Sequence, residues 1–102
     1  MKTQAHLLVM YPVPKDPKAF DRAYRDEHLP YAGPRLAGAL SVVSKRVATD
    51  KRYYAISDVT FPSLEALQEV ADSTRGKEAL AHAASISSGG APTILVLTDD
   101  LA

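Results

Sequence analysis

The sequence predicts an α+β fold in which four strands and two helical segments follow one another in the order βαββαβ. Four apolar segments have the length of strands, and the two segments between them carry apolar residues at the three- and four-residue spacing of a helix. Clusters of Pro, Gly and small polar residues separate these segments. The 102 residues suit one domain, so we expect a single domain over residues 1–102.

The first strand is expected from His6 to Tyr11, where the sequence HLLVMY is almost wholly apolar. Pro12 and Pro14 follow it. Because proline has no N–H to donate to a neighbouring strand, the strand should stop there.

The first helix should begin at Asp16, whose carboxylate can accept from the free N–H groups of the first turn, with Pro17 at the first helical position. Pro30 disfavours helical geometry at Leu29, so the helix should end there and residues 31–36 should form an irregular turn. The spacing places five residues along one face of this helix: Phe20, Ala23, Tyr24, Glu27 and His28.

Residues 39–48 and 52–61 predict the second and third strands, paired as an antiparallel hairpin around a polar turn at residues 49–51. Side chains alternate between the two faces of a strand. The third strand should therefore place Tyr53, Ala55, Ser57, Val59 and Phe61 on one face, and Tyr54, Ile56, Asp58 and Thr60 on the other.

Ser63 is the expected N-cap of the second helical segment. Its apolar stripe pauses near residues 72–74 and resumes through Gly76, which predicts a broken or kinked helix pair rather than one rod. A loop at residues 87–90 then leads to a last apolar strand at residues 93–98.

This order is the split βαβ, or ferredoxin-like, arrangement, in which helices cover one face of a four-stranded antiparallel sheet. Residues 7–10 and 94–97 are apolar at consecutive positions, so both faces of these strands need cover. A second copy packed about a two-fold axis is the economical cover for the bare face. We therefore expect a homodimer that pairs its two sheets.

Twelve basic and twelve acidic residues give a formal net charge of zero, which argues against nucleic acid or a membrane as the main partner. The cluster of Lys45, Arg46, Lys51 and Arg52 fits a solvated hairpin tip, with a local basic patch as the alternative. The absence of Cys removes disulfides and thiol chemistry and fits the cytoplasm. No signal peptide and no membrane span are predicted.

His28 is the leading candidate for chemistry. It falls on the inward face at the end of the first helix, one turn beyond Tyr24, where an imidazole can act as a general acid or base. The alternative is a structural histidine that hydrogen-bonds a carbonyl and fixes the turn before Pro30.

Other polar residues could complete a site around His28. Asp58 lies mid-strand and could orient a histidine, or pair with Lys45 or Arg46 across the hairpin. Neither His6 nor His82 has the spacing that would bring two ligands to one metal, so no metal is expected. Four tyrosines could bind a small ligand through their hydroxyls, or simply bury their rings as core: Tyr11, Tyr24, Tyr31 and Tyr54.

The opening motif resembles that of the EthD family: Tyr11-Pro12-x-Pro14-x-Asp16-Pro17, then Phe20, Tyr24 and His28-x-Pro30. The later Tyr54, the Phe61-x-Ser63-Leu64-Glu65-Ala66-Leu67 segment and Ser73-x-x-Gly76 are similar to its second half. The resemblance covers essentially the whole chain. It implies a dimeric α/β barrel with no obligatory cofactor, and it supports His28 as a functional residue.

Relatives of this architecture act as cofactor-free monooxygenases, lactone isomerases, polyketide cyclases or haem-handling proteins, so fold does not settle function. The leading hypothesis is a cofactor-independent enzyme that moves protons on a small, apolar, oxygenated metabolite, as an isomerase, cyclase or monooxygenase. The first alternative is a non-catalytic carrier of a small ligand or haem, accessory to another oxidoreductase. The second is a dimeric scaffold in which His28 is purely structural.

Overall fold

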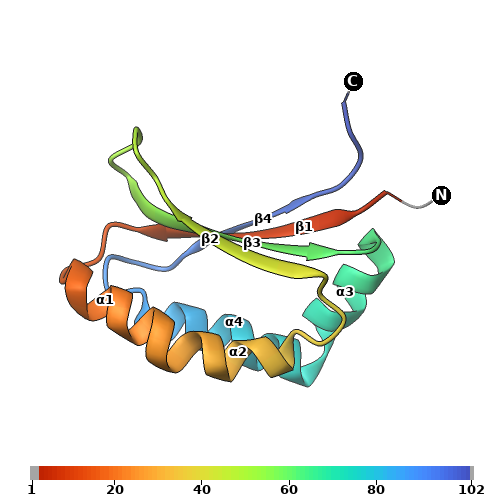
Figure 1. The fold of residues 1–102 in the computed structure, drawn as a ribbon, viewed down its shortest axis with the longest axis horizontal. Helices are drawn as coiled ribbons and strands as arrows, with labels where there is room; N and C mark the ends of the chain where they lie inside the picture. Colours follow the sequence, from red (N-terminus) through yellow and green to blue (C-terminus); the bar gives the residue numbers. More distant parts are fainter. Residues whose placement is uncertain (1–2, 102) are drawn as a thin grey trace.

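A computed structural model describes residues 3–101 and confirms the α+β ferredoxin-like fold. Four antiparallel strands form one sheet in the order β2-β3-β1-β4, and all the helices lie on one face of it (Figure 1). The elements run as follows: β1 (Ala5–Pro12), α1 (Pro17–Ala23), η1 (Tyr24–His28), α2 (Leu29–Arg35), β2 (Ser41–Arg46), β3 (Tyr53–Phe61), α3 (Leu64–Asp72), α4 (Thr74–Ile86) and β4 (Thr93–Leu97).

The first helical region begins as predicted but ends later. Asp16 is the N-cap of α1 and its side chain accepts from Ala19 N at 3.2 Å. The predicted end at Leu29 is wrong, because α2 carries the helical path on to Arg35 through Pro30. A turn of π-helix, η1, precedes this proline, and Leu29 N–H bonds Tyr24 O five residues back. Pro30 lies in the first turn of α2, where the proline's missing N–H group costs little stability.

The π turn also changes which side chains face inward. Phe20, His28 and Ala32 are buried, whereas Glu27, predicted on the same face, is exposed. A π turn holds more residues than an α turn, so residues four apart stay aligned while the residue three apart rotates outward. Tyr24 and His28 therefore open and close this one irregular turn. Turns of this kind recur at functional sites.

The second helical region is a pair of helices, as predicted. Ser63 caps α3 by accepting from Ala66 N at 3.1 Å. Ser73 ends α3 and caps α4, where its hydroxyl oxygen accepts from Gly76 N at 3.0 Å. The chain turns sharply here, and a Cβ added to Gly76 would lie 1.9 Å from Val70 O.

Replacing Gly76 with alanine should therefore destabilise the fold by about 1–3 kcal/mol, because the backbone carbonyl it meets cannot move cheaply. Gly33 in α2 is the matched control, since a Cβ there meets nothing within 4 Å. Gly33→Ala should instead stabilise by about 0.5–1 kcal/mol. Thermal unfolding of both variants checks this, at about 4–8 °C per kcal/mol for a chain of this size. Equal melting temperatures for the two variants would contradict the close approach.

The core lies between the sheet and the helices. Tyr11, Phe61 and Leu67 are the largest side chains that are fully buried. Alternate residues of β1 from Ala5 to Tyr11 face the helices and are buried, while those between them face the other side and are partly exposed. No helix covers that other face, which we call the open face (Figure 1).

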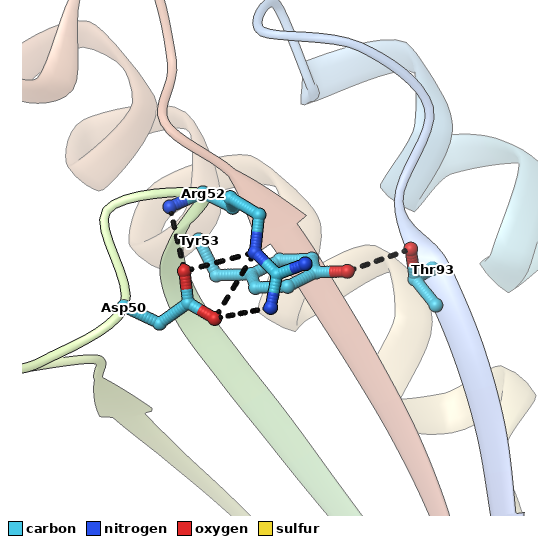
Figure 2. A network of polar contacts seen from close by, with 4 residues as sticks. All are labelled: Asp50, Arg52, Tyr53 and Thr93. Carbon is cyan, nitrogen blue, oxygen red and sulfur yellow. Dashed lines mark hydrogen bonds and ion pairs between the residues drawn. The ribbon is translucent and has the colours of Figure 1, made fainter.

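The tip of the β2–β3 hairpin is held by the polar network of Figure 2. Arg52 donates to both carboxylate oxygens of Asp50 and lies over the Tyr53 ring, 5.7 Å from its centroid. This guanidinium lowers the pKa of Asp50 to about 2. The Tyr53 hydroxyl reaches Thr93 on β4 at 3.5 Å, across the open face. The tip is thus internally paired.

The strand alternation predicted for β3 holds from Ala55 to Phe61 and fails at Tyr53 and Tyr54. The register shifts where Tyr11 pairs with Ala55 but Pro12 pairs with Tyr53, so β3 has one extra residue there. An extra residue reverses the facing of those beyond it. Tyr54 consequently packs against Phe20 on the helix side, with ring centroids 5.7 Å apart.

Candidate functional site

A cavity of about 40 Å³ lies between the helix-facing side of the sheet and the helices η1, α2 and α4. Its wall is largely apolar and includes Leu7, Val59 and Ala83. Four residues bring polar groups to it: Tyr11, Tyr24, His28 and Ser57. We call this space the inner cavity.

His28 reaches the inner cavity from the end of η1 and is only 7% exposed. Its Nδ1 shares a hydrogen bond with Nδ1 of His82, at 2.9 Å. Burial, and after it the nearby His82, lowers the pKa of His28 from 6.5 to about 4. The imidazole is therefore neutral at physiological pH and can accept a proton. Its Nε2 makes no hydrogen bond to any residue within 3–101.

Tyr11 brings a hydroxyl that is fully buried and has no hydrogen-bond partner among the described residues. Its ring is fixed edge-on against Phe20 and Tyr24, with centroids 5.0 and 5.9 Å away. Burial, and to a lesser degree Tyr24, raises the pKa of Tyr11, so the hydroxyl stays protonated. A buried polar group without a partner costs about 1–3 kcal/mol, which a ligand oxygen would recover.

Tyr24 closes the inner cavity on the side of the hairpin. Its hydroxyl hydrogen-bonds Ser57 Oγ at 2.6 Å and also Ser44 Oγ. Beyond this wall is an outer hollow of about 200 Å³ between α1, β2 and β3, and Tyr24 and Ser57 line both spaces. The two spaces are therefore neighbours separated by three hydroxyl-bearing side chains.

Charged groups line the outer hollow. Tyr54 donates to Asp21 at 2.9 Å, and Arg46 binds the same carboxylate at 2.5 Å. Burial, and after it Asp21, raises the pKa of Tyr54. Arg46, predicted as one partner for Asp58, thus pairs with Asp21 instead.

The structure brings three of the predicted residues to the inner cavity and Tyr54 to the outer hollow, but two others lie elsewhere. Tyr31 is stacked on His82 outside the cavity, with ring centroids 4.6 Å apart. Asp58 lies on the open face, where it hydrogen-bonds His6 Nδ1 at 2.9 Å. Asp58 therefore does orient a histidine, though not His28.

Sequence reasoning missed the role of His82 and of the two serines. The sequence spacing bears on His82 only as a possible metal ligand, and His82 lies 54 positions from His28, so no local spacing predicts their contact. Ser44 and Ser57 are cross-strand partners in the β2–β3 register, whereas the predicted turn at residues 49–51 would place Ser44 opposite Ile56. Nothing local showed that Tyr24 would reach them.

Within residues 3–101, no three or more His, Cys, Asp or Glu side chains are gathered so that they could hold a metal ion. None of the helices in that range is long and apolar enough to cross a membrane.

The sequence matches no family model and no curated protein. Solved structures do match. An EthD-family protein from Bacillus halodurans C-125 superposes with a TM-score of 0.81 at 21% identity, over 95% of this chain and 99% of that one. SnoaB, a cofactor-independent oxygenase from Streptomyces nogalater, gives 0.67 at 11% identity, over 97% and 95%. A dimeric ferredoxin-like protein of unknown function from Jannaschia sp. CCS1 gives 0.65 at 19% identity, over 95% and 99%. The resemblance to EthD-family proteins suggested by the sequence motifs is therefore confirmed in the fold.

Proposed function

We propose that the chain is a cofactor-independent enzyme that moves a proton on a small, largely apolar molecule carrying a carbonyl or phenolic oxygen. The observation that carries the proposal is that one apolar cavity is lined by both a neutral, buried His28 and the Tyr11 hydroxyl, which has no hydrogen-bond partner among the described residues. One group accepts a proton and the other binds an oxygen. Isomerisation and cyclisation through an enolate, and oxygenation of a carbanion by O₂, can each begin with such a step.

The two groups are suited to forming an enolate or phenolate. As the C–H or O–H bond of the substrate breaks, its proton passes to His28 Nε2 and the electron pair moves toward the substrate oxygen. The Tyr11 hydroxyl donates to that oxygen, and a fixed donor in an apolar site stabilises developing charge strongly. Because Tyr11 stays protonated, it keeps this role across the physiological range.

The small volume of the inner cavity supports a substrate route through the outer hollow. A space of 40 Å³ accommodates water but no metabolite, whereas ligand sites usually measure about 300–1,000 Å³. The outer hollow adds about 200 Å³ on the other side of Tyr24. A substrate would therefore enter from the outer hollow and displace Tyr24 from its serine partners.

The comparisons support the enzyme class without defining a reaction. SnoaB, which shares the fold, is a cofactor-independent oxygenase. The other matches include proteins of the EthD family and of unknown function. The shared fold makes cofactor-free proton chemistry compatible with this scaffold, and the residues of the inner cavity carry the argument for it.

Deuterium exchange into 2-tetralone, a small apolar ketone with readily enolised C–H bonds, tests the proposal. The wild-type chain should accelerate exchange in D₂O, followed by NMR, and His28→Gln should lower that rate by about 10²–10⁴-fold. Tyr11→Phe should lower it by about 10²–10³-fold while leaving stability unchanged or improved, because the orphan hydroxyl is removed.

Tyr53→Phe is the matched control, since that hydroxyl lies on the open face. This variant should catalyse deuterium exchange into 2-tetralone at the wild-type rate. Exchange that survives His28→Gln unchanged would overturn the proposal. Binding of 2-tetralone with no catalysed exchange would instead favour a ligand carrier.

For the open face we propose a second copy of the chain as the partner, which would give a homodimer. The face presents partly exposed apolar side chains from all four strands: Leu8, Met10, Val43, Ile56, Leu95 and Leu97. The edge strand β4 is exposed on both faces, with Ile94 and Val96 uncovered as well. The dimeric protein from Jannaschia with the same fold supports this choice.

A further inference from the structure

The hydrogen bond between His28 and His82 connects the inner cavity to the surface. His82 projects from α4 and is partly exposed, whereas His28 is buried. The two rings are nearly parallel, at 11°, with centroids 5.2 Å apart. His82 also stacks on Tyr31, with ring centroids 4.6 Å apart, and the Arg35 guanidinium lies over the Tyr31 ring at 3.6 Å from its centroid.

A hydrogen bond between two Nδ1 atoms requires that one of them carry a hydrogen. A neutral imidazole has one N–H, so the proton on one ring fixes what the other presents. When His28 holds its hydrogen on Nδ1, its Nε2 is a bare acceptor and can act as a base. When His82 supplies the hydrogen, the hydrogen of a neutral His28 lies on Nε2 and can act as an acid.

We propose that His82 is a positioning residue that selects the tautomer of His28 and relays protons between the inner cavity and solvent. The inference rests on the proposed function, because it concerns the histidine assigned there as the base. In the relay, the substrate X–H bond breaks as the Nε2–H bond of His28 forms. The Nδ1–H bond of His28 then breaks as the Nδ1–H bond of His82 forms.

The relay ends with the positive charge on His82 rather than in the cavity. A cation is costly in an apolar space, and its cost falls where water can reach it. The face of the Tyr31 ring also favours a cation stacked on it. The Nε2–H bond of His82 then breaks and its proton passes to water, so that both imidazoles are neutral again.

The charged groups near the His28–His82 pair are paired with each other. Arg35, which lies over the Tyr31 ring, forms an ion pair with Glu78 of α4 at 3.6 Å. From β1 and η1 the neighbours are the Tyr11 and Tyr24 side chains. The group that hydrogen-bonds His28 Nδ1 is the His82 ring and not a carboxylate. The second histidine thus occupies the position where many sites place an orienting carboxylate.

NMR of ¹⁵N-labelled histidine in the free protein tests the pairing without any substrate. We expect one ring with its hydrogen on Nδ1, a bare Nδ1 on the other, and scalar coupling across the N–H···N bond. In His82→Gln the coupling should vanish, and the ring proton of His28 should exchange with water at least about tenfold more slowly. Finding both rings with hydrogen on Nε2 and no coupling would overturn the relay.

A second experiment separates a relay from a merely structural role. His82→Ala should slow 2-tetralone exchange, and imidazole added to the buffer should restore much of the rate by taking the place of the lost ring. Gln68→Ala, on the exposed side of α3, is the control and should behave as the wild type. Unaltered exchange in His82→Ala would overturn the relay and leave the proposed function intact. A coupled pair with slowed proton exchange in His82→Gln, but no wild-type turnover, would overturn the function and support the relay.

Discussion

Acidification from pH 6.5 to pH 4 should lower the free energy of unfolding by about 3 kcal/mol through His28. The folded chain holds this imidazole neutral, since burial and the nearby His82 lower its pKa from 6.5 to about 4. The unfolded chain protonates it near the ordinary value. Between these two pKa values the unfolded state binds more protons, so stability falls as the pH falls. Above about pH 7.5, where neither state binds this proton, the contribution of His28 no longer changes with pH.

Urea unfolding at a series of pH values, at fixed protein concentration, measures this effect. His28→Gln should show a shallower loss of stability over the same window, because Gln does not titrate. Carboxylates titrate in both proteins, so their contribution cancels in the difference. His6→Gln, on the open face, controls for the loss of a histidine as such. Parallel pH profiles for wild type and His28→Gln would show that His28 is not held neutral by the fold.

The strands and helix starts could be predicted because their signals are local. Apolar runs bounded by proline and polar turns fixed the four strands to within two residues. Asp16 and Ser63 were recognisable as N-caps because capping needs only a side-chain oxygen and the next few N–H groups. The break near Ser73 was visible as an interruption of the apolar stripe.

The errors have specific physical causes. A proline normally ends a helix, but the π turn before Pro30 keeps the helical path going and rotates Glu27 outward. Tyr54 changed faces because one extra residue in β3 reversed the alternation. Neither the π turn nor the register shift has a strong sequence signal.

Part of the site followed from the sequence and part depended on tertiary packing. Tyr24 and His28 were placed on one inward face by spacing alone, and Tyr11 by its position on a buried strand. His82 reaches His28 only because α4 packs against η1 across the same face of the sheet. Asp58 lies on the open face because successive residues of a strand face opposite sides of the sheet and Asp58 directly follows Ser57. A shift of one position along β3 thus determines that the Ser57 hydroxyl lines the inner cavity and that the Asp58 carboxylate does not.

Met10→Asp should raise the dissociation constant of the proposed dimer by at least about 100-fold. Met10 lies on the central strand β1 with Ile56 and Thr93 as its cross-strand neighbours, near the middle of the open face. In a sheet-to-sheet dimer the two-fold axis brings the new carboxylate into an apolar interface twice. A loss of about 1.4 kcal/mol in each subunit is enough for a 100-fold change, and an unpaired buried charge costs more than that.

Light scattering coupled to size-exclusion chromatography measures the outcome. The wild type should elute with twice the mass of the chain and Met10→Asp with a single mass, while Gln68→Asp, on the exposed side of α3, should remain dimeric. A monomeric wild type at micromolar concentration would refute the dimer. On the open face, His6 Nδ1 hydrogen-bonds both Asp58 and Thr60, at 2.9 and 3.2 Å. These bonds offset part of the cost of covering Asp58 with a second copy, whereas an aspartate at position 10 would have no such partner.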